Sequence, residues 1–347
     1  MSESEQRLLT KSGELLDDQG NLNDYGWARQ PVLDANLEKA HFYRLRFLQP
    51  LRMKRWDYYG IFTPDYFFSF TISDVGYLGM VFAYVVDFRQ KTCHEETISI
   101  PFAKGVILPR NSIGGESRYQ SKKVSLKFEV GKNQRRIQAD WKGFNEKGLS
   151  ADISLATSPE HESMTIVIPI VGKRFYYNRK MNCLPASGWV EYLGQRHEIL
   201  PETCLGSLDW GRGVWEYASF WVWASASGFL ADRRRVGLNL GFGFGDTSAA
   251  TENAIILDGC VHKLGQVDFD YKSGDFMRPW KMTSPDGRLN LTFTPFYERV
   301  AKTDAKILSS EVHQMFGKYN GSFVSDSQEA IEIKDLTGFA EEHHARW

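Results

Sequence analysis

The fold is decided by short runs of strand-forming residues separated by tight turns. Residues 254–264, Ala-Ile-Ile-Leu-Asp-Gly-Cys-Val-His-Lys-Leu, show this pattern most clearly. Two largely apolar runs flank Asp258-Gly259, a dipeptide that readily adopts the positive φ angles of a two-residue hairpin turn. Pro285-Asp286-Gly287 and Asn320-Gly321 stand between similar runs and predict two further hairpins. Hairpins that follow one another along a chain produce antiparallel sheets.

The same pattern continues outward from this hairpin, from residue 42 almost to the C-terminus. Phe, Tyr and Trp make up 14% of the 347 residues, and these side chains favour pleated strands and the walls of ligand cavities. No segment of twelve or more residues keeps a helical apolar stripe, which argues against alternating βαβ units. The sequence therefore predicts an all-β protein, a sandwich or a barrel fold.

The length of the chain suggests two domains or one large β unit. Trp56-Asp-Tyr resembles Trp215-Glu-Tyr, and each triplet opens an aromatic strand, as two tandem β-barrels would require. Coincidence among so many aromatic residues explains this echo equally well. We predict an irregular N-terminal segment over residues 1–40, a first β-barrel over 41–190 and a second over 191–347.

Charge and composition restrict the partners and the location. Lys and Arg number 42 against 43 Asp and Glu, and this balance argues against nucleic acid as a partner. The acidic N-terminus differs from a secretory signal, and no apolar run approaches the roughly 20 residues of a membrane span. The four cysteines include no Cys-x-x-Cys pair. We expect a cytoplasmic protein with reduced thiols, no integral membrane segment and a small molecule as its ligand.

Polar residues first cluster in residues 209–217, Asp-Trp-Gly-Arg-Gly-Val-Trp-Glu-Tyr. Asp209 is a candidate catalytic acid or base, and Arg212 is a candidate for binding an anion or polarising an oxygen. Trp210 and Trp215, together with Trp221 and Trp223 in the next aromatic strand, could stack against a substrate. The alternative is an Asp–Arg ion pair that holds a turn beneath packed indole rings.

A second cluster lies in residues 241–253, Gly-Phe-Gly-Phe-Gly-Asp-Thr-Ser-Ala-Ala-Thr-Glu-Asn. The glycine spacing matches neither G-x-G-x-x-G nor the P-loop, so a dinucleotide site is not expected. Glu252 is a candidate catalytic residue if it faces a cavity, and otherwise it would cap the loop by bonding to backbone amides.

A third cluster lies in the predicted strand Ser310–Phe316. The two-residue period places Glu311, His313 and Met315 on one face and Val312, Gln314 and Phe316 on the other. Glu311 and His313 are candidate catalytic residues, with the carboxylate orienting the imidazole as a general base. If that face points to solvent, the pair has no catalytic role.

The C-terminus contains Glu341, His343 and His344 and ends at Trp347 beside Arg346. We expect the terminal Trp to pack against the body of the protein. These side chains could ligate a metal, but adjacent histidines of a regular element cannot both easily face one ion. We therefore expect no metal site and no cofactor.

Several of these motifs resemble a known family, the one named domain of unknown function 2804. The resemblance rests on the segments already quoted and on five more: Lys54-Arg-Trp-Asp-Tyr58, Thr63-Pro-Asp65, Pro285-Asp-Gly-Arg288, Glu311-Val-His-Gln-Met-Phe-Gly317 and Ala340-Glu-Glu-His-His-Ala-Arg-Trp347. It covers nearly the whole chain and implies two tandem lipocalin-like (calycin) antiparallel β-barrels. It brings no established activity or catalytic residues. More remotely, the implied architecture is similar to that of carotenoid hydratases, tocopherol cyclases and some fungal cyclases.

Two functions from different classes fit this sequence, with a third less favoured. The first is a cofactor-independent acid/base enzyme that acts on a small apolar or glycosidic substrate in an aromatic-lined cavity, as a hydratase, cyclase, isomerase or hydrolase. The second is a non-catalytic carrier of an apolar small molecule. The third is a scaffold without a cavity. The enzyme hypothesis predicts that Asp209, Arg212, Glu252, Glu311 and His313 converge in one pocket.

Overall fold

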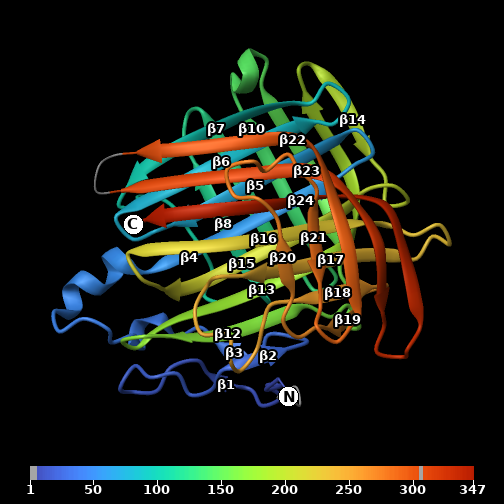
Figure 1. Ribbon diagram of the computed structural model, residues 1–347. Coiled ribbons are helices and arrows are strands. Elements are labelled where there is room, and N and C mark those ends of the chain that lie inside the picture. Colours follow the sequence, from blue (N-terminus) through green and yellow to red (C-terminus); the bar gives the residue numbers. More distant parts are fainter. Residues whose placement is uncertain (1–5, 305–307) are drawn as a thin grey trace.

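The computed structural model describes residues 6–304 and 308–347, and most of these residues lie in antiparallel strands (Figure 1). The described helices are three short 3₁₀ segments, η1 (Leu37–Lys39), η2 (Arg46–Arg52) and η3 (Phe144–Glu146). None of them is long and apolar enough to cross a membrane. Nearly all strands belong to two large, curled antiparallel sheets, which confirms the predicted fold class.

The first sheet contains thirteen strands. Ten of them form a continuous path, in hydrogen-bonded order β7 (Thr92–Pro101), β6 (Leu78–Asp87), β5 (Tyr66–Asp74), β4 (Lys54–Phe62), β15 (Leu205–Val214), β13 (Arg174–Tyr192), β11 (Leu149–Ala156), β10 (Gln134–Trp141), β9 (Val124–Val130) and β8 (Gly115–Gln120). The strands β12 (Met164–Ile170) and β14 (Gln195–Ile199) pair with β13. The sheet curls over its own apolar core. As a result, β8 at the end of the path comes close to β4, and Ser117 of β8 donates a hydrogen bond to Asp57 of β4.

The second sheet contains nine strands. Their hydrogen-bonded order is β19 (Cys260–Lys263), β18 (Ala254–Leu257), β17 (Arg235–Phe242), β16 (Ala218–Phe229), β24 (Ala330–Arg346), β23 (Ser309–Val324), β22 (Leu289–Asp304), β21 (Trp280–Thr283) and β20 (Asp268–Asp270). Residues of this sheet form a separate apolar core, which includes Leu238, Trp280 and Phe293.

The N-terminal segment contains only short strands. β1 (Gly13–Glu14) pairs in parallel with β3 (Leu33–Asp34), and β2 (Gly26–Ala28) joins the first sheet through β12. Residues 1–5 of the predicted irregular segment lie outside the described residues.

Two of the three predicted hairpin turns are confirmed. Asp258 and Gly259 have φ angles of 48° and 87° between β18 and β19, and Pro285-Asp286-Gly287 separates β21 from β22. The hairpin predicted at Asn320-Gly321 is wrong, because β23 runs straight through both residues. The register of β23 against β24 shifts there instead, and Gly321 has a φ of 139°. A glycine within a strand pattern can mark such an irregularity as well as a turn.

The two sheets pack against each other through two apolar clusters. One joins Phe62, Phe67 and Tyr84 of the first sheet to Phe316 and Phe339 of the second. Figure 1 shows the corresponding strands, with β22–β24 (orange to red) over β4–β6 (blue). The other cluster joins β12 and β13 to β18 and β19.

A bulge in β13 adds polar links between the two sheets. The Nδ2 atom of Asn182 lies 3.0 Å from Ser225 Oγ, and the Cys183 amide donates to Ser227 Oγ at 3.0 Å. The strands change from one sheet to the other between Val214 and Ala218, whereas the division into domains after residue 190 stays a prediction.

Candidate functional site

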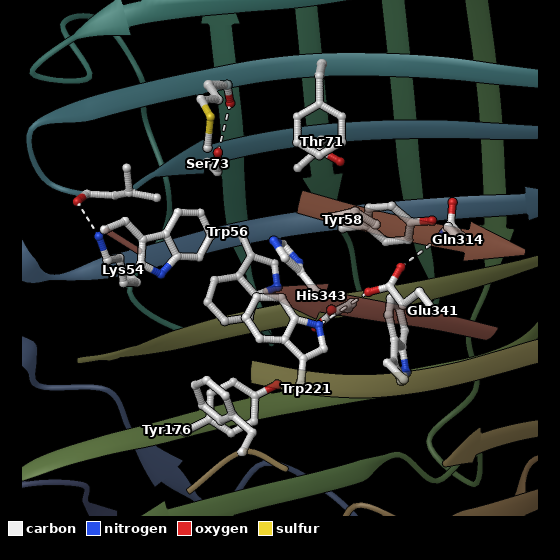
Figure 2. Close-up of a pocket in the computed structure, with 18 of the residues that line it drawn as sticks. Lys54, Trp56, Tyr58, Thr71, Ser73, Tyr176, Trp221, Gln314, Glu341 and His343 are labelled. Carbon is white, nitrogen blue, oxygen red and sulfur yellow. Dashed lines mark hydrogen bonds between the residues drawn. The ribbon is translucent and has the colours of Figure 1, made fainter. Parts of the chain in front are cut away.

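A cavity of about 220 Å³ lies between the two sheets. Side chains from β4, β5, β6, β13 and β15 line it on one side, and side chains from β16, β22, β23 and β24 line it on the other. Figure 2 shows aromatic rings and a small number of charged groups around this space. Its volume exceeds that of an engineered apolar cavity of roughly 150 Å³ that binds benzene. The cavity can therefore hold a compact organic molecule.

Aromatic rings in mutual edge contact form one wall of the cavity. Trp215 contacts Trp56 at 5.3 Å and Phe244 at 5.3 Å between ring centroids, both in edge geometry. Tyr176 contacts Phe244 at 4.9 Å, and Trp221 contacts Phe244 at 5.8 Å. Such contacts hold the rings in fixed orientations, so the wall is already formed without a ligand.

Gly211 of β15 makes room for one of these rings. It is the register partner of Trp56, and a Cβ atom at this glycine would lie only 2.0 Å from Trp56 Cζ2. The Trp56 indole therefore occupies the space that a side chain at position 211 would need. The glycine of the Asp209-Trp-Gly-Arg motif is required for this steric reason.

Replacing Gly211 by alanine is expected to push the Trp56 indole out of the cavity wall. Overpacking of this kind costs about 1–3 kcal/mol of stability. Urea unfolding and the binding of ligands to the cavity would measure the effect. Gly114→Ala is the control, because a Cβ atom there meets nothing within 4 Å. Unchanged stability and unchanged binding in Gly211→Ala would contradict this role.

Glu341 of β24 is a buried acid in the wall of the cavity. Its carboxyl oxygens accept hydrogen bonds from Trp221 Nε1 at 3.3 Å and from Gln314 Nε2 at 3.0 Å (Figure 2). Burial raises the pKa of Glu341 to about 7, and the positive charges of Arg299 and Lys180 lower this pKa less than burial raises it. The carboxyl group can therefore hold or release a proton near neutral pH.

A chain of hydrogen bonds fixes the orientation of Glu341. Gln314 donates to Glu341 through its Nε2 atom. The Oε1 atom of Gln314 accepts from Arg299 Nη1 at 3.4 Å. Arg299 is held in turn by Glu95, through contacts of 2.9 and 2.6 Å, and lies over the ring of Tyr84. This chain runs from β7 of the first sheet to β24 of the second, so it positions the acid relative to both walls.

Asp209, which we predicted as a catalytic residue, lines the cavity. It forms an ion pair of 2.8 Å with Lys180, and Asn178 Nδ2 donates to its other oxygen at 2.6 Å. The ammonium group of Lys180 also lies 3.8 Å from the centre of the Trp223 ring. Both carboxylate oxygens of Asp209 are therefore already occupied by side chains of the protein.

Glu252 and three of the predicted tryptophans also line the cavity, namely Trp215, Trp221 and Trp223. Asn239 connects two of these residues, because its Oδ1 atom accepts from Trp223 Nε1 at 2.7 Å and its Nδ2 atom donates to Glu252 Oε2 at 3.2 Å. Their predicted roles in catalysis and substrate binding stay predictions.

Arg212 and Trp210 do not line the cavity. Their side chains lie on the opposite face of β15, where Trp210 belongs to the core of the first sheet and the Arg212 guanidinium lies over its ring. Arg212 forms a fully buried ion pair of 3.0 Å with Asp57 and donates to three backbone carbonyls. Arg212 therefore forms an Asp–Arg ion pair beside a packed indole ring, as in the structural alternative to a binding role, but its partner is Asp57 rather than Asp209.

Glu311 and His313 are also outside the cavity. They form a cluster near the surface, in which His313 contacts Glu298 at 2.7 Å and Glu311 at 3.3 Å, and Glu311 pairs with Lys302. The cavity face of β23 carries Val312 and Gln314 instead. The predicted convergence of five residues in one pocket is therefore met only by Asp209 and Glu252.

Several polar residues of the cavity were not predicted as site residues, among them Lys54, Lys180, Arg299, Gln314, Glu341 and His343. His343 contacts Ser310 Oγ at 2.9 Å and packs on Trp221, and burial lowers its pKa to about 3, so its imidazole is neutral near neutral pH. The two-residue period of β24 places Phe339, Glu341 and His343 on one face. This period is the sequence signal that could have placed Glu341 and His343 in one site. Trp347 packs against Trp215, as expected for the C-terminus.

All four cysteines are free. Within residues 6–304 and 308–347, no group of three or more His, Cys, Asp or Glu side chains could hold a metal ion.

The family model described as Domain of unknown function (DUF2804) matches residues 6–347. No curated protein matches the chain significantly. Among solved structures, CghA with Sch210972 is similar to it with a TM-score of 0.52 and 10% identity, covering 86% of this chain and 89% of that chain. Kievitone hydratase from Nectria haematococca has a TM-score of 0.48 and 9% identity, covering 85% and 88%. At such identities, the similarity to CghA shows a shared fold alone.

Proposed function

The chain belongs to the DUF2804 family, and from this premise we propose that its cavity is the active site of a cofactor-independent acid/base enzyme acting on a small, largely apolar substrate. The observation that carries the proposal is Glu341, a buried carboxylic acid with a pKa of about 7 in an aromatic cavity. General acids work best when their pKa lies near the working pH.

Glu341 would deliver its proton to a carbon–carbon double bond or to a carbonyl oxygen of the substrate. Protonation creates positive charge in the substrate, and the aromatic ring of Trp221 could stabilise this charge. The carboxylate left behind would then remove a proton from an adjacent carbon, which completes an isomerisation or cyclisation without a co-reactant. If water instead attacks the cation, the water supplies the replacement proton and the product is a hydrate.

Asp209 has a different role in this proposal from the acid or base that we predicted. Its ion pair with Lys180 would place a positive charge against Trp223 at the wall of the cavity, so it acts as a positioning residue. The fold-level similarity to CghA, whose crystal structure contains Sch210972, supports binding of a small molecule only as an analogy.

Deuterium exchange distinguishes the enzyme from the carrier. The purified protein would be incubated in D₂O with a panel of unsaturated apolar compounds, terpenoid alkenes and cyclic enones, and thermal shift and product mass would be measured. An acid/base enzyme places deuterium on carbon in at least one compound that raises the Tm. Glu342→Gln, next to the acid but bonded to Tyr271 and Ser273 rather than facing the cavity, should behave like the wild type. Ligands that raise the Tm but never gain deuterium would support the carrier.

A further inference from the structure

One end of the cavity carries a lysine that forms no ion pair with any of the described residues. Lys54 of β4 is completely buried, and its ammonium group donates one hydrogen bond, to the carbonyl of Val75 at 3.1 Å (Figure 2). The same group lies 4.9 Å from the centre of the Tyr77 ring and 5.2 Å from that of Trp347. At least one further N–H of the ammonium group is therefore left without a hydrogen-bond acceptor among the described residues.

The acid that acts on Lys54, Asp74, compensates its charge only in part. Asp74 forms an ion pair with Arg55 and accepts the Gly76 amide at 2.7 Å. In the described part of the chain, no carboxylate forms an ion pair with Lys54, whereas Lys180 in the same cavity has Asp209 at 2.8 Å. Burial, together with the charge of Arg52, lowers the pKa of Lys54 to about 7, and the charge of Asp74 opposes this shift only in part. A buried ammonium group of this kind tends to lose its proton, and a ligand that supplies an anion would keep it charged.

Two indole groups of the same cavity, one of them next to Lys54, also lack acceptors. The Nε1 atoms of Trp215 and Trp347 are buried and have no hydrogen-bond partner, and the two rings are 6.3 Å apart. Trp215 is only 4% exposed. Indole and ammonium groups are donors only, so Lys54, Trp215 and Trp347 form a donor cluster with several unused N–H groups and no acceptor of their own. Buried donors without partners in a native protein call for an explanation, such as a ligand that is absent.

We propose that the donor cluster binds the carboxylate of an apolar carboxylic acid, whose hydrocarbon body fills the aromatic part of the cavity. A carboxylate offers two oxygens and about four lone pairs, which match several donors at once. Figure 2 shows Lys54 and Glu341 well separated among the labelled residues. A substrate anchored at Lys54 would therefore extend its reactive carbon atoms toward the acid. This inference rests on the proposed function and names the substrate class of the same site.

Matched pairs of ligands test the proposal. Isothermal titration calorimetry would compare cinnamate with cinnamamide and 1-naphthylacetate with 1-naphthylacetamide, pairs that differ mainly in charge. The wild type is expected to bind the carboxylate about tenfold more tightly or better, as a charged hydrogen bond provides. Lys54→Met should lose this preference, and Trp347→Phe, which keeps an aromatic ring but removes the N–H, should weaken carboxylate binding several-fold and amide binding less.

Lys104→Met is the matched control, because it removes a lysine charge at an exposed position and should keep the full preference. The proposal is overturned if neither carboxylate binds, if the amides bind as tightly, or if Lys54→Met retains the preference, which would assign recognition to Lys180 or Arg299. Glu341→Gln should retain the carboxylate preference even though it lacks the acid. A failure of the acid/base proposal is therefore distinguishable from a failure of the donor cluster.

Discussion

Replacing Glu341 by glutamine is expected to lower turnover about 10²- to 10⁴-fold, the usual contribution of a positioned general acid. Glutamine keeps the volume of the side chain and can still accept from Trp221, but it has no proton to transfer. The affinity for substrate should change little, because the aromatic wall and the donor cluster are untouched. Steady-state kinetics on the compound identified by deuterium exchange would separate kcat from KM.

The pH dependence provides an independent reading of the same residue. Turnover that requires protonated Glu341 should fall as the pH rises above about 7, the pKa of this carboxyl. Glu342→Gln should preserve that profile. Full activity of Glu341→Gln, or a rate that rises through pH 7, would contradict the assignment.

The stability of the protein should show the same ionisation. The pKa of Glu341 is about 7 in the folded protein against 4.5 for an ordinary glutamate, so the folded state holds a proton that the unfolded chain releases. The resulting stabilisation is present below about pH 4.5 and is lost as the pH rises through 7. It amounts to on the order of 3 kcal/mol. Comparing urea unfolding of the wild type and Glu341→Gln across this range isolates the effect.

Replacing Arg212 by methionine is expected to lower the free energy of unfolding by about 3–5 kcal/mol, the typical cost of breaking a buried ion pair. The change leaves Asp57 buried with only Ser117 as a side-chain partner, and three backbone carbonyls lose their donor. Urea unfolding measures the loss. Ligand binding at equal folded fraction should be unchanged, because Arg212 lies on the face of β15 away from the cavity.

Two comparisons make the Arg212 result specific. Arg136→Met breaks an exposed ion pair with Asp152 on the surface of the first sheet, where solvent screening makes the pair contribute little. The double variant Asp57→Leu/Arg212→Met should recover most of the lost stability, because it removes both buried charges. If Arg212→Met were as stable as Arg136→Met but abolished ligand binding, Arg212 would belong to the site after all.

The fold was largely predictable because its signals are local. The turns at Asp258-Gly259 and Pro285-Asp286-Gly287 each depend on two or three adjacent residues, and both are present as expected. Asn320-Gly321 carries the same signal and failed, because the pairing of β23 with β22 continues through both residues and its pairing with β24 resumes after a register shift. A hairpin dipeptide indicates where the chain can turn, whereas the surrounding ladder decides whether it does.

The candidate site was predictable only in part because its strands are covered on both faces. β15 is buried at every position from Leu205 to Val214, so its sequence does not alternate between apolar and polar residues. Asp209 faces the cavity and Arg212 faces the core of the first sheet. In β23, the face that we predicted to be catalytic carries Glu311 and His313, whereas the other face, with Val312 and Gln314, lines the cavity. A difference of one residue in this choice exchanges the entire set of side chains.

The amino-acid sequence by itself determined that this protein is built from antiparallel sheets rich in aromatic residues, because turn dipeptides and apolar runs act over a few neighbouring positions. Only the tertiary structure decided which ionisable groups share a space. Lys54, Lys180 and Glu341 come from β4, β13 and β24, which lie far apart in sequence and meet only when the two sheets pack together. Their environment, and with it the pKa values of Lys54 and Glu341, is created by that packing, because burial between two sheets removes the water that surrounds the same groups in the unfolded chain.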